Sequence, residues 1–138
     1  AVSAGAEVVT GGNKVSASCH EATVLFDPPA DSKVSTLEIF GPAVCVYPYS
    51  DLDEAIARAN SLPFAFQSAV CTQDIDRAMR CFRKLDASAV MVNDHTAFRV
   101  DWMPFAGLKH SGYNVGGIHH TMHDMQIEKM LVLRSAEL

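Results

Sequence analysis

The chain has 138 residues, the length of about one domain, and its 49 % hydrophobic and 20 % charged residues are typical of a globular protein. Its 11 basic and 16 acidic side chains give a net charge of −5, which argues against nucleic acid or an anionic membrane as the main partner. No apolar run approaches the roughly 20 residues of a membrane helix and no signal peptide is visible, so we expect a cytoplasmic protein.

The first third of the chain predicts short strands. Residues 1–4, followed by Gly5, resemble the last turn of a helix with its glycine cap. Strands are predicted over Ala6–Thr10, Ala22–Phe26 and Ala43–Tyr47, because each is apolar and is bounded by glycine or proline.

The middle of the chain alternates helix and strand. Ser50 is expected to cap a helix that ends at Asn60. A second helix is predicted from about Asp74 to Lys84, between strands over Ser68–Thr72 and Ala89–Val92. This alternation is typical of an α/β unit with parallel strands.

The periodicity fails after Asn93, and residues 94–122 are expected to be irregular and either functional or packed onto a partner. The chain closes with a strand-like segment, Lys129–Arg134, that is expected at a sheet edge. The predicted second helix presents an apolar face made of Ile75, Ala78, Phe82 and Leu85.

The four cysteines, which lack a CxxC pair, are expected to be reduced thiols in a core. Cys45 and Cys71 each lie in an apolar run, which favours this interpretation.

Three histidines near the end of the chain raise the question of a metal site. His119 and His123 are spaced to share a helical face beside His120. Zinc requires further ligands at a fixed spacing, and the sequence offers no matching pair. We therefore predict a solvated histidine-rich segment and no metal site, with a metal-binding module as the alternative.

Glu38 and Phe40 precede a rigid Gly41-Pro42 turn and a predicted strand. A carboxylate in such a place can accept hydrogen bonds from a pair of ligand hydroxyls, and the aromatic residue offers an apolar face to a ring. The alternative is a surface glutamate beside a core phenylalanine.

Five segments resemble, in order and spacing, motifs of the aldehyde dehydrogenase superfamily. Among them, Leu37–Pro42 resembles the E-[IV]-F-G-P segment and Pro104–Gly112 resembles the PFGG-x-K-x-SG signature. The resemblance extends over nearly the whole chain, and the segments that carry it are Leu37–Pro42, Asp53–Asn60, Val70–Asp74, Val90–Asn93 and Pro104–Gly112.

The resemblance implies the C-terminal part of a longer NAD(P)-dependent enzyme. Its fold is expected to be α/β, a three-layer open sheet with mostly parallel strands plus a C-terminal oligomerisation strand. Residues 1–125 are assigned to the catalytic domain and residues 126–138 to the oligomerisation strand. The family's nucleophilic cysteine, general base and oxyanion-hole asparagine lie upstream, so no catalytic residue is assigned here and the isolated chain is predicted to be inactive.

The resemblance also implies roles for individual residues. Glu38 matches the glutamate that hydrogen-bonds the cofactor ribose of NAD or NADP, and Phe40 matches the aromatic residue beside the nicotinamide. The segment Asp94–Met103, with Phe98, matches the loop that closes the tunnel for a small, often anionic, aldehyde. Within it, His95 or Arg99 is expected to pair with an anionic group of the substrate. The alternative for Arg99 is a salt bridge to Asp101 or another surface acid.

Two departures from the family pattern affect the signature region. Ala106 replaces a glycine, and Gly116 stands where many members carry a glutamate of a proton relay, so no relay is assigned to this segment. The resemblance implies three partners: an aldehyde substrate, NAD or NADP, and a second copy of the chain. A self-associating structural module without catalysis is kept as the alternative function.

Overall fold

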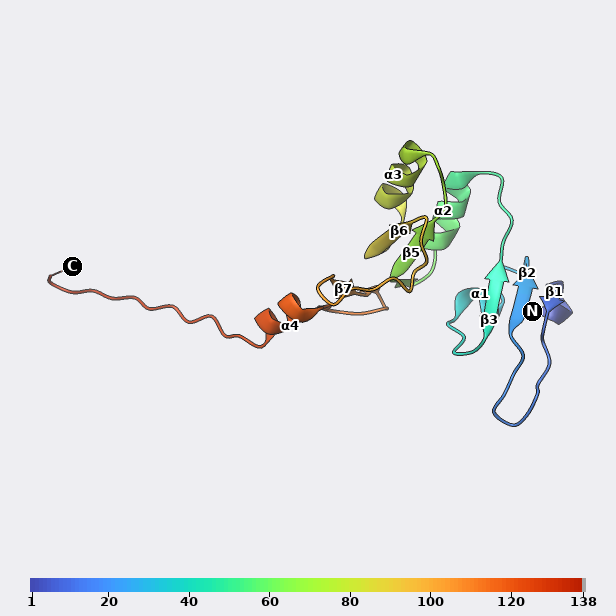
Figure 1. Cartoon of the computed structure of the whole chain (residues 1–138), viewed down its shortest axis with the longest axis horizontal. Helices are drawn as coiled ribbons and strands as arrows, with labels where there is room; N and C mark the ends of the chain where they lie inside the picture. Colours follow the sequence, from blue (N-terminus) through green and yellow to red (C-terminus); the bar gives the residue numbers. More distant parts are fainter. Residues whose placement is uncertain (138) are drawn as a thin grey trace. The chain divides into compact units, whose positions relative to one another are not determined.

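The computed structural model describes residues 1–137, and the chain divides into two units, residues 1–55 and the part from Ile56 onward (Figure 1). The chain has an α/β fold, as predicted, with helices and strands mixed along its first 92 residues. Among the described residues, no helix is long and apolar enough to cross a membrane.

The first unit contains a three-stranded sheet in the order β1-β2-β3. β2 and β3 are parallel, with Thr23 opposite Ala43, whereas β1 is antiparallel to β2 with an irregularity between Val8 and Thr10. A short 3-10 helix before β1 ends at Gly5, whose φ of 106° confirms the predicted glycine cap. The elements of this unit are η1 (Val2–Ala4), β1 (Glu7–Thr10), β2 (Thr23–Phe26), α1 (Lys33–Thr36) and β3 (Ala43–Val46).

The connection from β1 to β2 depends on Gly11. Its φ is 72°, and a Cβ atom there would meet the carbonyl oxygen of Ala22. The next amide, of Gly12, donates to Thr23 Oγ1 at 2.9 Å. Only glycine allows the backbone to approach β2 this closely.

The helix α2 (Leu52–Asn60) begins as predicted but is capped by a different residue. The amide of Glu54 donates to Asp51 Oδ1 at 2.9 Å. The expected cap, Ser50, is wrong because it stands one residue too early to reach the third amide of the helix. Ile56 is the buried residue of this helix.

The second unit is built around a strand–helix–strand crossover. β5 (Gln67–Val70) and β6 (Ala89–Val92) are parallel, and α3 (Ile75–Lys84) connects them. Asp74 caps α3 by accepting from the amides of Asp76 and Arg77, close to where the helix was predicted to begin.

The carboxyl ends of β5 and β6 are tied together by Asn93 and Thr72. Asn93 Nδ2 donates to the Thr72 carbonyl at 2.8 Å, and the Thr72 amide donates to Asn93 Oδ1 at 2.8 Å. Asn93 adopts a φ of 58°, a left-handed conformation that asparagine tolerates better than most residues.

The segment 94–122, predicted to be irregular, contains three short strands and most of a helix. β4 (Phe64–Ala65) pairs with β8 (Leu108–Lys109), and β7 (Phe105–Ala106) pairs with β9 (Val115–Gly116), both antiparallel. The helix α4 (Ile118–Asp124) follows. Two-residue strands show no periodicity, so the sequence pattern could not indicate them.

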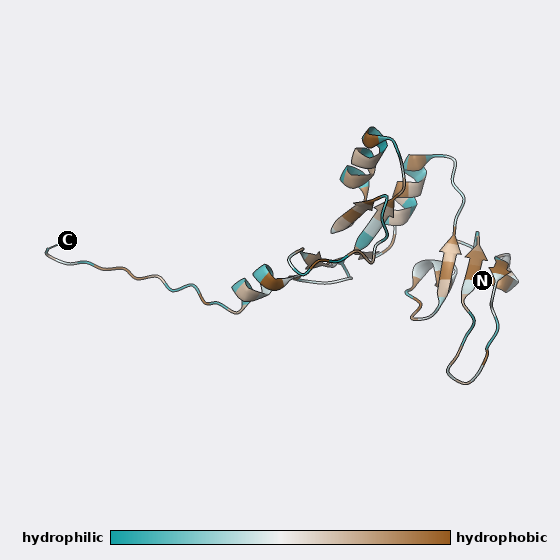
Figure 2. Ribbon diagram, viewed as in Figure 1, coloured by the Kyte–Doolittle hydropathy of each residue, from teal (hydrophilic) through white to brown (hydrophobic). Residues whose placement is uncertain are grey.

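Part of the predicted apolar face of α3 is exposed. On α3 the buried residues are Ala78 and Cys81, while Ile75 and Phe82 of the predicted apolar face are exposed. Figure 2 shows such hydrophobic residues spread over the ribbon.

Residues 126–135 carry no helix or strand in the structure (Figure 1). A strand exists only where a neighbouring strand supplies its hydrogen bonds, and the segment Lys129–Arg134 has no such neighbour in the described chain. Its predicted place at a sheet edge therefore stays a prediction.

Candidate functional site

Glu38 and Phe40 lie on the segment between α1 and β3. This segment turns tightly, because the Gly41 amide donates to the Ile39 carbonyl at 2.8 Å and the Ala43 amide donates to the Gly41 carbonyl at 2.8 Å. The Phe40 ring is 94 % exposed, and Glu38 is also exposed. Within residues 1–137 the Glu38 carboxylate has no hydrogen-bond or ion-pair partner, so it is available to a ligand. The alternative of a core phenylalanine at position 40 is wrong in this chain.

Hydroxyl groups fix the short helix that leads into this segment. Tyr47 Oη donates to Ser35 Oγ at 2.7 Å, and Ser35 Oγ donates to the Pro29 carbonyl at 2.8 Å. Ser32 Oγ donates to the same carbonyl at 2.7 Å. α1 is thus held on the turn after β2, whose Pro28 is fully buried, and the segment carrying Glu38 starts from an anchored position.

The segment Asp94–Met103 is organised by two turns. The Phe98 amide donates to the His95 carbonyl at 3.2 Å, and the Met103 amide donates to the Val100 carbonyl at 3.1 Å. His95 Nε2 lies 3.8 Å from Asp94 Oδ1, and both side chains are exposed. Phe98 is also exposed.

Arg99 is the residue of this segment whose side chain packs on an aromatic ring. Its guanidinium carbon lies 4.4 Å from the centre of the Phe105 ring, a cation–π contact. The Phe105 ring itself packs edge-on against Phe66, with 4.8 Å between ring centres. The alternative of an ion pair with Asp101 is not realised in the described chain. Phe105 lies in the motif Pro104–Gly112 but was not among the predicted site residues.

An open groove of about 700 Å³ lies between this segment and α4. Its lining is mainly apolar, with Arg99 and Asp101 as the charged members. His95 and Phe98 do not line it. The lining residues are Arg99, Asp101, Gly117, Ile118, Thr121, Met122, Met125 and Gln126.

The histidines of α4 form a cluster of rings beside a smaller hollow of about 310 Å³. The His119 and His123 ring centres are 4.6 Å apart, which confirms that the two share a helical face, and His120 lies edge-on to His119. In the described part of the chain, no group of three or more metal-ligating side chains is placed to hold a metal ion.

All four cysteines are free thiols. Cys81 is the buried one, on the inner face of α3, and Cys45 is half-buried. Cys19 and Cys71 are exposed, which corrects the expectation of core positions for both. For Cys71 the cause is local. The reason is that β5 ends at Val70, so Cys71 lies just beyond the strand that was predicted to include it.

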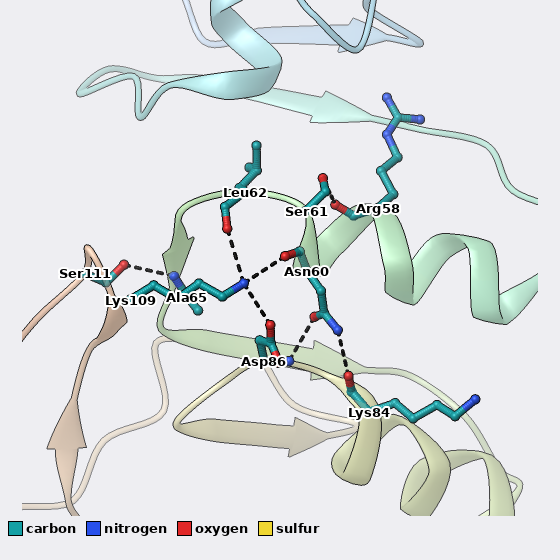
Figure 3. A network of polar contacts seen from close by, with 9 residues as sticks. All are labelled: Arg58, Asn60, Ser61, Leu62, Ala65, Lys84, Asp86, Lys109 and Ser111. Carbon is teal, nitrogen blue, oxygen red and sulfur yellow. Dashed lines mark hydrogen bonds and ion pairs between the residues drawn. The ribbon is translucent and has the colours of Figure 1, made fainter.

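A polar network centred on Lys109 was also missed by the sequence analysis (Figure 3). Lys109 Nζ lies 2.8 Å from Asp86 Oδ2 and donates to the Asn60 carbonyl at 2.8 Å. The Asn60 side chain in turn binds the backbone at Lys84 and Asp86. Long-range contacts of this kind leave no local sequence signal.

Comparison with known proteins identifies relatives over almost the whole chain. Residues 1–131 match the family model described as the aldehyde dehydrogenase family. The chain is 35 % identical over 133 residues to 3-sulfolactaldehyde dehydrogenase of Priestia aryabhattai, which is 96 % of this chain and 28 % of that protein. It is 34 % identical over 134 residues to lactaldehyde dehydrogenase of Methanococcus maripaludis, which is 97 % of this chain and 28 % of that protein.

Solved structures agree with these relatives. Aldehyde dehydrogenase 21 of Physcomitrella patens, in complex with the reaction product succinate, superposes with a TM-score of 0.90 at 38 % identity, over 98 % of this chain and 28 % of that one. Glyceraldehyde-3-phosphate dehydrogenase of Methanocaldococcus jannaschii, complexed with NADP, superposes with a TM-score of 0.82 at 29 % identity, over 90 % and 26 %. The chain thus spans little more than a quarter of the length of these proteins.

Proposed function

The chain belongs to the aldehyde dehydrogenase family, and we propose that it forms the C-terminal part of an NAD(P)-dependent enzyme that oxidises a small, anionic aldehyde to its acid. The observation that carries the proposal is the pair Glu38 and Phe40. Both stand on the segment that matches a family motif, and both are exposed, with Glu38 left without a partner in residues 1–137.

The residues of this segment fit a nicotinamide cofactor. A carboxylate with two free oxygens can accept hydrogen bonds from the two hydroxyls of a ribose. An exposed aromatic face beside it can pack against the nicotinamide ring. When bound, NAD(P)+ accepts the hydride that leaves the substrate. Glu38 and Phe40 would hold that end of the cofactor in place, with α1 and its hydroxyl contacts keeping the segment fixed.

Arg99 is proposed to bind the anionic group of the substrate. A guanidinium presents parallel N–H donors that match a carboxylate or a sulfonate. The contact with the Phe105 ring restricts rotation of the Arg99 side chain, so less side-chain entropy is lost when an anion binds. The names of two similar proteins support an anionic substrate. Sulfolactaldehyde carries a sulfonate, and the succinate bound to the Physcomitrella patens enzyme carries carboxylates. His95 and Phe98 lie outside the groove that Arg99 lines, and they are proposed to contact the aldehyde from the exposed side of the segment.

The chain carries no nucleophilic cysteine in a family context, so we propose that these 138 residues do not oxidise aldehydes by themselves. Incubating the isolated chain with NAD+ or NADP+ and several small aldehydes tests this directly. Formation of NAD(P)H above a buffer control would contradict the assignment.

The cofactor assignment is tested in the complete enzyme with Glu38→Gln, which keeps the size of the side chain and removes its charge. We expect the KM for NAD(P)+ to rise about tenfold, because hydrogen bonds to charged groups contribute about 1.5–3 kcal/mol. Glu7→Gln is the matched control, since Glu7 is an exposed acid of β1 in the same unit. An unchanged KM in the Glu38 variant would refute the role of Glu38.

A self-associating role is the second candidate, and it has its own observation. Met130, Leu131 and Val132 are 85 %, 84 % and 82 % exposed on a segment without a strand partner. Such an edge favours pairing with a second copy of the chain. Light scattering of the chain, with and without residues 127–138, tests this. A strict monomer at high concentration would exclude it.

A further inference from the structure

The Lys109 ammonium uses all three of its protons (Figure 3). It donates to the Asn60 carbonyl at 2.8 Å and to the Leu62 carbonyl at 3.3 Å, and it lies 2.8 Å from Asp86 Oδ2. These acceptors belong to the end of α2, the turn after it and the turn after α3. A surface lysine paired with one carboxylate contributes little to stability, but the Lys109 ammonium contacts three residues, Asn60, Leu62 and Asp86.

Asn60 completes the network from the opposite direction. Its Nδ2 donates to the Lys84 carbonyl at 2.7 Å, and its Oδ1 accepts from the Asp86 amide at 2.9 Å. The ends of α2 and α3 are therefore fastened to each other, and Lys109 joins β8 to that junction. The His110 amide adds a further tie by donating to the Pro63 carbonyl at 2.9 Å.

The backbone of Lys109 gives a second, independent indication. Its φ is 52°, in the left-handed region that glycine adopts more easily than a lysine. A lysine in this conformation has to be held there by its surroundings. The three contacts of the ammonium supply the reason.

A short, stiff path connects Lys109 to Arg99. Gly107 alone separates β8 from β7, and a Cβ atom on Gly107 would meet the carbonyl of Ser111, so the connection has no room to relax. β7 begins with Phe105, whose ring lies 4.4 Å below the Arg99 guanidinium. A displacement of β8 therefore moves the ring on which Arg99 rests.

We propose that Lys109 is a positioning residue for Arg99: by fixing β8 to the junction of α2 and α3, its ammonium fixes Phe105 and with it the guanidinium that selects an anionic aldehyde. This inference rests on the proposed function, in which Arg99 binds the anionic group. Lys109 touches neither substrate nor cofactor in this scheme, and it acts through Phe105.

The test uses the complete enzyme, with succinate semialdehyde as the anionic substrate and butanal as a neutral one of the same carbon number. In Lys109→Met we expect the KM for succinate semialdehyde to rise between about tenfold and about a hundredfold, the range that follows from displacing a binding group by about 1 Å. The KM for butanal and for NAD(P)+ should stay within about twofold. Lys109→Arg should recover part of the loss because it keeps the charge and several donors.

Two further variants separate the ammonium from the backbone and from general charge. Lys109→Gly relieves the strained conformation but removes the ammonium, so it should behave like Lys109→Met. Lys14→Met removes one lysine from an exposed segment of the other unit and should leave every constant unchanged. A glycine variant that equals the wild type, or a methionine variant that affects both aldehydes equally, would overturn the inference.

Amide hydrogen exchange supplies a readout that does not depend on substrate. Peptides covering residues 98–110 should exchange faster in Lys109→Met than in Lys14→Met. If that variant does not fold, Asp86→Asn, which removes the charge of the one carboxylate among the three acceptors, should show the same effect in weaker form. A wild-type enzyme without preference for succinate semialdehyde contradicts the proposed role of Arg99. Unchanged exchange over residues 98–110 contradicts the link from Lys109 to Phe105.

Discussion

Gly107 offers the sharpest stability prediction of this structure. A Cβ atom there would overlap the carbonyl carbon and oxygen of Ser111, which are backbone atoms and cannot rotate away. Gly107→Ala must therefore move the backbone of residue 107 away from the backbone of Ser111, which follows β8. Ala106, the preceding residue in β7, already carries a methyl group. The clash is therefore specific to position 107.

The hydrogen bonds that depend on this turn set the magnitude. The Ser111 amide donates to the Leu108 carbonyl at 2.9 Å, the Ala65 amide donates to Ser111 Oγ at 3.1 Å, and the His110 amide donates to the Pro63 carbonyl at 2.9 Å. Each contributes about 1 kcal/mol, so losing the three costs about 3 kcal/mol. Gly112→Ala should cost less, because its nearest neighbour is the Gly107 Cα at 3.2 Å and can yield slightly.

Native-state amide exchange measures this cost where it arises. The opening free energy of the Ala65 and His110 amides should fall by about 3 kcal/mol in Gly107→Ala, while amides in α3 change little. Ala106→Gly is the matched control, since it adds no atom, and should lower the opening free energy by at most about 1 kcal/mol. Equal protection of Ala65 in Gly107→Ala and the wild type would refute the reasoning.

Three further changes have defined outcomes. Arg99→Met should lower kcat/KM for succinate semialdehyde by about 10- to 100-fold, since an exposed charged hydrogen bond contributes about 1.5–3 kcal/mol, and should spare butanal; a loss on both substrates would contradict it. Asp74→Ala should reduce unfolding free energy by about 1 kcal/mol in a urea titration, with Asp74→Asn nearly neutral, because two amides of α3 lose their acceptor. Asn93→Ala should cost about 2–3 kcal/mol in the same titration, since it loses both bonds to Thr72 and the favoured left-handed conformation; Asn93→Gly, which keeps the conformation, should cost less.

The elements that the sequence predicted well are those whose signals are local. α3 begins one residue after Asp74 and ends at Lys84, because capping and helical periodicity act within a few residues. β6 coincides with Ala89–Val92, whose apolar run is bounded on both sides. The cap of α2 was predicted at Ser50 but is Asp51. Both residue types are good caps, and the choice depends on which residue the first turn of the helix follows.

The contact between Arg99 and the Phe105 ring could not be predicted from the local sequence pattern. Phe105 approaches Arg99 only because β7 pairs with β9 and because Phe66 packs against the ring from the strand region before β5. Phe105 itself is six residues from Arg99, but Phe66 and β9, which hold it in place, are much farther away in the sequence. Lys109 was visible in the motif, but its contacts to Asn60, 49 residues away, depend on the fold.

The exposed apolar residues show what the hydrophobic pattern describes. Ile75 and Phe82 follow the spacing of a buried helix face, and Ile39 and Phe40 stand in a motif segment, yet all four are exposed in this chain. The pattern is consistent if these faces pack against polypeptide that the relatives possess and this chain does not include, since it spans 28 % of their length. The apolar spacing of α3 and of the segment before β3 is therefore not explained by the packing within residues 1–137 alone.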